Sequence, residues 1–168
     1  MLKSFYFLIL FLVFFSCNNN EKINIKGNWY TANFNPHMMD SINNEDDINF
    51  YYEEVFLTDN VIYSYSNVQG FLSPYMYKLK KDSLSISYGI NGEFFDYRGK
   101  VKTVDNNHFI LINSENKEDH FFRLINVENS LDKFISFKDS INPVFEQKGT
   151  LFSQEFIYRS EKKYSEIK

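Results

Sequence analysis

The most regular pattern in the sequence is YMYKLKKDSLSIS, at residues 75–87. Apolar or aromatic side chains occupy every second position of its first half, and Leu84 and Ile86 alternate with serines in its second half. The halves meet at Lys81-Asp82, where a tight turn would fit. Because successive side chains of a strand point to opposite faces of a sheet, the pattern predicts two antiparallel strands with one buried and one solvated face.

Strand-like patterns continue on both sides of this hairpin. Before it, the sequence predicts strands at 25–34, 50–57 and 61–66, and after it at 94–103, 108–113 and 119–125. Short turns such as Thr58-Asp59-Asn60 join most of these eight strands. Sequential antiparallel strands leave two open sheet edges, and closure into a barrel removes them. The predicted fold class is therefore all-β, an antiparallel eight-stranded up-and-down barrel.

The periodicity changes after residue 125. Apolar residues at 131, 134 and 135 have helical spacing after a cap at Asn129 or Ser130, which predicts a short helix that ends before Pro143. Residues 151–159 return to a strand-like pattern and predict an extra strand. The charged tail at 160–168 is expected to fray. Since no internal repeat is seen, one barrel domain is expected over 25–159.

The first residues predict an exported protein. Lys3 precedes an apolar stretch at residues 5–15 that is too short for a transmembrane helix, which needs about 20 apolar residues. A basic start, an apolar run and the small residue Ser16 before a cleavage point are typical of a secretory signal peptide at 1–16. The alternative is a buried N-terminal helix, although the stretch has no polar face for a surface helix to expose.

Cys17 is the only cysteine in the chain. Its place after the apolar run, in FFSCNNNEK at residues 14–22, resembles the lipobox of bacterial lipoproteins. The resemblance implies cleavage before Cys17, acylation of the thiol by a chain such as palmitate, and stable attachment to a lipid bilayer by several acyl chains. A free thiol and an intermolecular disulfide are the alternatives, and no disulfide can form within the chain.

Residues 17–24 would then form a polar tether between the bilayer and the barrel. The segment after Cys17 lacks the run of acids that resembles surface-export signals of Bacteroidota lipoproteins. The expected location is therefore the bacterial outer membrane, facing the periplasm. The net charge of −4 and the lack of a basic cluster in the sequence argue against a nucleic-acid partner.

The order of the predicted elements resembles that of lipocalins. Gly27-Asn28-Trp29, at the start of the first strand, resembles the Gly-x-Trp signature of that family, and eight strands followed by a helix and a further strand is the family's plan. The resemblance implies that a late arginine, here Arg123 in FFRL, lies across Trp29. No second lipocalin signature is recognised, and the two disulfide cysteines frequent in secreted lipocalins are absent. The chain is similar to small lipocalin-like lipoproteins of Bacteroidota.

A barrel of eight strands is either filled by side chains or just wide enough for one small ligand. Five tyrosines from successive predicted strands are expected on its inner face: Tyr63, Tyr65, Tyr77, Tyr88 and Tyr97. Each phenol combines an apolar ring with a hydrogen-bonding tip, so the group could line a pocket for a lipid, a pigment or another flat hydrophobic molecule. The alternative is that these rings simply fill the core.

No pattern in the sequence indicates catalysis or a metal site. The histidines at 37, 108 and 120 are far apart, and neither a nucleophile elbow nor a pair of carboxylates at catalytic spacing is seen. The acids at 40 and 45–47 lack the glycine-centred spacing of a calcium loop, which favours a solvated loop. We therefore expect a protein without a cofactor that is not an enzyme, with an envelope hydrolase as the remaining alternative.

The predicted function is binding of a small hydrophobic ligand by a membrane-anchored barrel. The alternative is a protein-binding module, such as an immunity lipoprotein or an accessory subunit of an envelope complex. Its candidate contacts are the acidic loop at 40–47 and the side chains of Phe94 and Met76.

Overall fold

The computed structural model describes residues 23–34, 50–71, 74–87, 92–136 and 143–168, with the backbone alone at 34 and 143–146. The elements within these ranges are β1 (Gly27–Phe34), β2 (Phe50–Leu57), β3 (Val61–Ser66), β4 (Gly70–Phe71), β5 (Tyr75–Lys80), β6 (Ser83–Ser87), β7 (Asp96–Asp105), β8 (His108–Ile112), β9 (Glu118–Arg123), α2 (Leu131–Ile135) and α3 (Pro143–Ile167). Among these described segments, no helix is long and apolar enough to cross a membrane.

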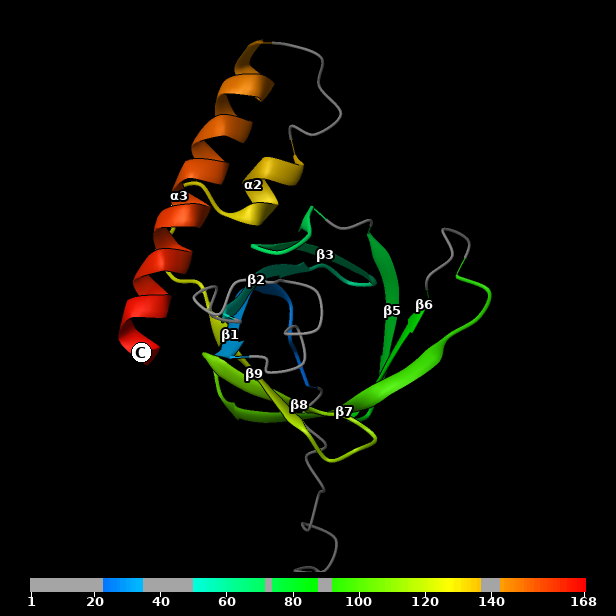
Figure 1. Ribbon diagram of the computed structural model, residues 1–168. Helices are drawn as coiled ribbons and strands as arrows, with labels where there is room; N and C mark the ends of the chain where they lie inside the picture. The colour runs from blue at the N-terminus through cyan, green and yellow to red at the C-terminus, as the bar shows by residue number, and fades with distance from the viewer. Residues whose placement is uncertain (1–22, 35–49, 72–73, 88–91, 137–142) are drawn as a thin grey trace, which may run out of the picture.

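The strands form one closed antiparallel sheet (Figure 1). Neighbours follow the order β2-β1-β9-β8-β7-β6-β5-β3, and β3 pairs again with β2 to complete the ring. The short β4 pairs with β3 outside the ring. The predicted all-β fold class, an eight-stranded antiparallel up-and-down barrel with an extra strand and a C-terminal helix, is confirmed, although the extra strand is β4 and not the one expected after the helix. Pairing around the ring is uneven. β1 and β2 pair over eight residues, whereas only two residues of β3 are paired with β5.

The barrel interior is apolar at the end where β1 begins. Its buried side chains are Ile25, Trp29, Val55, Leu57, Tyr77, Leu84, Val101 and Phe109. The segment 23–26 runs into this end, and Ile25 is only 3% exposed. The indole Nε1 of Trp29 donates a hydrogen bond to the carbonyl oxygen of Ile25 at 2.8 Å. The segment before β1 thus belongs to the core and occupies part of one barrel mouth.

A second core lies outside the barrel, between the two helices and the outer face of β1–β3 (Figure 1). Its buried side chains are Phe50, Tyr52, Leu131, Phe152 and Phe156. The rings of Tyr52 and Phe156 lie 5.2 Å apart, and Tyr65 on β3 meets Phe156 edge to face at 4.7 Å. Both faces of β2 are therefore buried, one by the interior and one by the helices.

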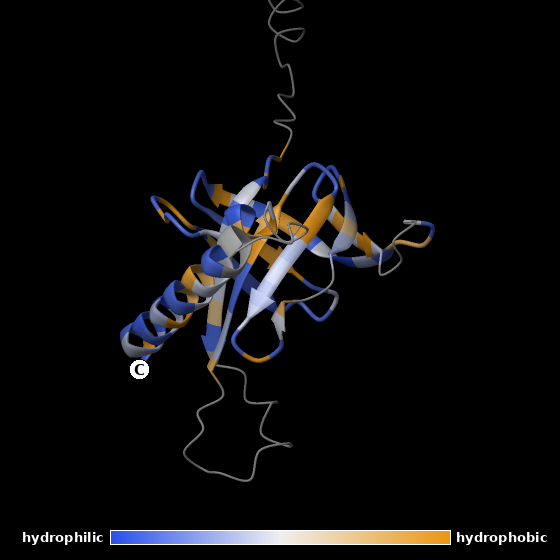
Figure 2. Ribbon diagram, turned by 90° about the horizontal axis from the view of Figure 1, so that it is seen from above, coloured by the Kyte–Doolittle hydropathy of each residue, from blue (hydrophilic) through white to orange (hydrophobic). Residues whose placement is uncertain are grey.

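The prediction of a strand at 151–159 is wrong, because these residues lie within α3. The residues at 160–168, expected to fray, continue this helix as far as Ile167. The strand prediction rested on aromatic and β-branched composition, but Phe152 and Phe156 are four residues apart and so share one side of a helix. Packing of that side against β2 and β3 overrides local strand propensity. Figure 2 shows hydrophobic residues concentrated on the strands and a largely hydrophilic α3.

Candidate functional site

The three signature residues meet at the barrel end where β1 begins. The guanidinium of Arg123 lies 4.4 Å from the ring centroid of Trp29, and its Nη2 donates to the carbonyl oxygen of Lys26 at 3.1 Å. Gly27 has a φ of +119°, and a Cβ at this position would lie 2.8 Å from Nη1 of Arg123. The expected contact between arginine and tryptophan is therefore present, and glycine is the residue that leaves room for it.

The five tyrosines do not share one face, so that prediction is wrong. Tyr77 alone among the described four lies in the interior core. Tyr63 and Tyr65 belong to the outer core under the helices, Tyr97 is 51% exposed, and Tyr88 lies outside the described residues. The alternation along β3 was identified correctly, but the helices bury the face that was taken to be internal. At Tyr97 a register shift between Leu84 and Ser85 changes which side chains of β7 face inward.

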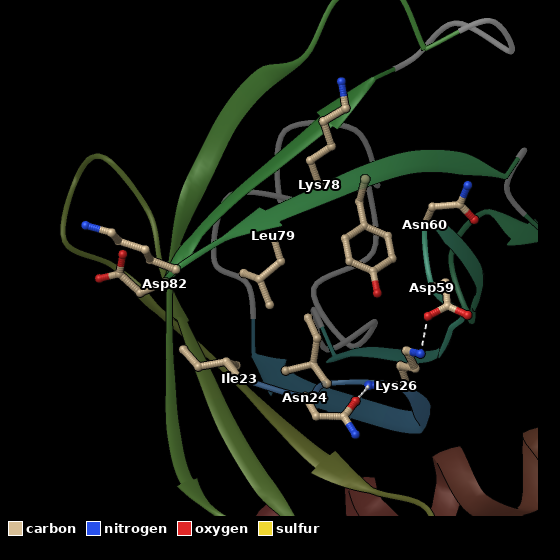
Figure 3. A pocket seen from close by; sticks show the side chains of 11 residues that line it. Ile23, Asn24, Lys26, Asp59, Asn60, Lys78, Leu79 and Asp82 are labelled. Atoms are coloured by element: carbon tan, nitrogen blue, oxygen red, sulfur yellow. Dashed lines mark hydrogen bonds and ion pairs between the residues drawn. The ribbon is translucent and has the colours of Figure 1, made fainter. Parts of the chain in front are cut away.

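A pocket of about 1080 Å³ opens beside Tyr77, at the barrel mouth that the N-terminal segment enters (Figure 3). Its apolar part comes from Ile23, Ile25, Leu79 and the ring of Tyr77. The charged residues that line it are Lys26, Asp59, Lys78, Lys81 and Asp82. Figure 3 shows Leu79 pointing into the hollow, with the ion pair between Lys26 and Asp59 at its edge. The pocket therefore has an apolar wall and a charged entrance.

The incomplete pairing of β3 with β5 explains this opening. Their register covers Val61 opposite Met76 and Ile62 opposite Tyr75, and Tyr77 N donates to the carbonyl oxygen of Asn60 at 2.7 Å. Beyond this point the chain turns back at Thr58–Asn60, while β5 continues to Lys80. The pocket lies in the resulting gap, between the end of β5 and the segment 23–26.

A smaller pocket of about 340 Å³ lies on the other side of the same segment. Trp29, Phe109 and Arg123 line it, and Asn24 and Ile25 line both pockets. The segment therefore separates two hollows at one barrel mouth.

Tyr77 carries the hydrogen-bonding group nearest to the apolar wall. Its hydroxyl donates to the carbonyl oxygen of Thr58 at 2.6 Å. Burial, and then the charge of Asp59, raises the pKa of the phenol above its usual value, so Tyr77 stays neutral at physiological pH. With Lys26 and Asp59 paired, the pocket suits a ligand with an apolar body and a polar end.

Beyond the apolar core, the interior contains a cluster of polar residues that the sequence did not reveal. Tyr51 and Ser64 hydrogen-bond to the carboxylate of Glu53, and Asp119 lies close enough to repel it. Burial, and then the charge of Asp119, raises the pKa of Glu53, although both hydrogen bonds lower it. Burial also raises the pKa of Asp119. The interior therefore changes from apolar near Trp29 to polar at Glu53, two residues before Val55 on β2.

The outer face of β8 and β9 brings two histidines together. Nε2 of His108 lies 3.0 Å from Nδ1 of His120, and the ring of Phe122 stacks on His108 at 4.5 Å. Both histidines lie in the hairpin that the sequence predicted. Its register places His108 opposite Phe122 and His120 opposite Ile110, so the two histidines are diagonal neighbours. Within the ranges given above, no three His, Cys, Asp or Glu side chains converge on a position for a metal ion.

Several predicted features lie outside the described residues. They are Cys17, the signal peptide at 1–16, most of the tether, His37 and the acidic loop at 40–47. The site argued from the structure is consequently the pocket beside Tyr77. Comparison with protein-family models, with curated proteins and with solved structures found no match to this chain.

Proposed function

We propose that this chain is a membrane-anchored lipoprotein whose barrel binds a small hydrophobic molecule with one polar end. The observation that carries the proposal is the pocket of about 1080 Å³ at the mouth beside Tyr77, with an apolar wall and a charged rim. Small-molecule sites combine such walls with a few polar groups in volumes of roughly 300–1,000 Å³. The site replaces the tyrosine-lined interior that the sequence predicted.

The ligand chemistry follows from the lining. Ile23, Ile25 and Leu79 offer an aliphatic surface, which favours an acyl chain or a fused ring over a sugar or a nucleotide. Lys78 and Lys81 both line the pocket and take part in no ion pair among the described residues, so they are cations available to an anionic end of the ligand. An amphipathic acid is the ligand class that fits both features.

The test is uptake of an anionic apolar fluorophore, anilinonaphthalene sulfonate, by the purified protein. Leu79→Glu places a negative charge in the apolar wall and should weaken binding of the anionic probe by about tenfold or more. Ile23→Glu should do the same from the segment before β1. Val104→Glu, at a site that is 50% exposed on β7, is the matched control and should bind like the wild type. Equal binding by all four proteins would rule out this pocket as the site.

The anchor is a separate part of the proposal and has its own experiment. Cys17→Ser should release the protein from the membrane fraction or leave its precursor unprocessed, because the sulfur that would carry the acyl chain is gone. Ser16→Ala, next to it, should leave attachment intact. Unchanged membrane attachment of the Cys17→Ser protein would refute the anchor and leave the ligand pocket untouched.

Binding of another envelope protein is a second candidate function. It is supported by Phe94, whose side chain is 83% exposed, whereas the other predicted contact, Met76, is partly buried. The test is co-purification of one protein partner with the wild type and its loss with Phe94→Ser.

A further inference from the structure

Four lysines gather on the outer face of β5 and β7: Lys78, Lys80, Lys100 and Lys102. All four are exposed. Ser83 on β6 lies opposite both Lys80 and Lys100, and Ser85 lies opposite Lys78. Since neighbouring strands are about 4.8 Å apart, the two lysine-bearing strands are about 10 Å apart with only small hydroxyl side chains between them. We call this surface the lysine face.

The charges of the lysine face are not neutralised within the described parts of the chain. None of its four lysines takes part in an ion pair there, although the chain as a whole carries a net charge of −4. Nζ of Lys78 instead lies 3.7 Å from the ring centroid of Phe95. Like charges held this close repel each other, and a negatively charged partner would relieve that repulsion. The lysines do not form a continuous run in the sequence, because an inward-facing residue separates the two lysines of each strand.

Exposed aromatic rings border the same surface. Tyr97 lies opposite Ser85 and is 51% exposed, and Phe94 is 83% exposed. Phe94 therefore presents most of its apolar ring to water, and it directly precedes Phe95, whose ring lies against Lys78. Lysines beside aromatic rings are typical of proteins that bind at the bilayer interface, where headgroups meet the cations and the acyl region receives the rings. A soluble polyanion would neutralise the lysines but would offer nothing to Phe94.

We propose that the lysine face docks on a bilayer surface that carries anionic headgroups, with Phe94 and Tyr97 inserted at its interface. The place where the chain enters the domain agrees with this orientation. Ile23 lines the same pocket as Lys81 and Asp82, the turn that joins β5 to β6 at the edge of the face. Cys17 is a short tether away, at most about 20 Å when extended. Only the argument from the length of the tether rests on the proposed anchor at Cys17.

The experiment measures vesicle binding of the full chain carrying Cys17→Ser, so that no acyl anchor contributes. Vesicles of phosphatidylcholine alone are compared with an equimolar mixture with phosphatidylglycerol, by co-sedimentation at several salt concentrations. Binding to the mixed vesicles should be stronger and should fall with salt. Changing the four lysines of the face to glutamine should weaken it by nearly three orders of magnitude, about 600-fold, since each lysine near an anionic surface contributes about fivefold.

The matched control removes the same charge elsewhere, by changing Lys117, Lys148, Lys162 and Lys168 to glutamine. These exposed lysines lie on the β8–β9 loop, on α3 and directly after α3, and this variant should bind nearly as well as the parent. Phe94→Ser should weaken binding by about fivefold or more without changing the salt dependence. Equal losses in the two lysine variants, or equal binding to the two vesicle types, would overturn the proposal.

A soluble polyanion provides the last comparison. The contrary outcome is that dextran sulfate binds the protein as tightly as the mixed vesicles do and that Phe94→Ser weakens neither interaction. That result would overturn docking on a bilayer in favour of a soluble partner. Uptake of anilinonaphthalene sulfonate is measured on Phe94→Ser and on a lysine variant that keeps Lys78, because Lys78 also lines the pocket. It therefore reports on the pocket separately. A failure of the lysine face and a failure of the ligand pocket are therefore distinguishable.

Discussion

Arg159 on α3 holds the carboxylate of Glu54 on β2 through two hydrogen bonds, from Nε at 2.7 Å and from Nη2 at 3.1 Å. The side chain of Glu54 is fully buried, and Tyr52 donates a third hydrogen bond to it at 3.0 Å. These contacts join residues 105 positions apart in the sequence. The long C-terminal helix is therefore fixed to the outside of the barrel by a specific polar contact within an aromatic core.

The first prediction concerns this contact. Arg159→Met should lower the free energy of unfolding by about 3–5 kcal/mol, because it leaves the carboxylate of Glu54 buried without its cation. Adding Glu54→Leu should restore most of the loss, since a buried apolar pair replaces the ion pair. Urea unfolding followed by circular dichroism measures both changes.

The control is an exposed pair on the same helix. Nζ of Lys163 lies 2.6 Å from Oε2 of Glu166, and Lys163→Met should cost less than about 1 kcal/mol. If Arg159→Met cost no more than Lys163→Met, the contact with Glu54 would not be what holds α3 in place.

The same part of the molecule shows what the sequence could and could not predict. Strand-like patterns, strictly alternating only over β5–β7, identified the eight strands of the ring, because each strand has one face in the barrel interior. The sequence could not show which face of β3 points into the barrel. Tyr63 and Tyr65 do belong to a hydrophobic core, but it is the outer core under the helices. That core exists only because α3 covers it, and α3 was itself mistaken for a strand.

The candidate sites show the same limit. The contact between Trp29 and Arg123 followed from a family resemblance, whereas the pocket beside Tyr77 depends on where β3 stops pairing with β5. No local pattern encodes that end point. Likewise, the polar cluster around Glu53 and the lysine face join single residues of different strands, so only the register brings them together.

The second prediction is that Gly149→Ala stabilises the protein by about 0.5–1 kcal/mol. Gly149 lies within α3, where alanine favours the helix by roughly this amount over glycine. The added methyl group would meet the ring of Phe134 at 3.4 Å, an ordinary van der Waals contact. Thermal unfolding should show a midpoint raised by about 1–4 °C. A lowered midpoint would show that Phe134 has no room to accept the methyl group.

The third prediction concerns Gly27. Gly27→Ala should destabilise the fold by about 1–3 kcal/mol, because alanine rarely adopts a φ of +119°. Its Cβ would also push Arg123 away from the ring of Trp29, so the tryptophan fluorescence of the folded protein should change. Gly70→Ala, at a φ of +68° with open space around it, is the comparison and should cost about 1 kcal/mol. An unchanged emission spectrum for Gly27→Ala would mean that Arg123 stays in place.

The last prediction follows from the acids inside the barrel. Burial raises the pKa of Glu53, so the folded protein holds this proton up to a higher pH than the unfolded chain does. The stabilisation that this proton provides is complete below the unfolded pKa and is lost as the pH rises through the folded pKa. Glu53→Gln removes that loss, because the amide stays neutral and its oxygen can still accept a hydrogen bond from Tyr51 or Ser64.

The variant should therefore be more stable than the wild type at neutral pH, and the difference should shrink as the pH falls. Urea midpoints measured from about pH 4 to about pH 8 give the stability of each protein as a function of pH. The way the difference between the two curves changes with pH reports the proton that Glu53 binds. Glu161→Gln, on the exposed side of α3, is the control and should follow the wild type. A Glu53→Gln protein less stable than the wild type at neutral pH would show that the carboxylate is held charged, with a cation or a donor satisfying it inside the barrel.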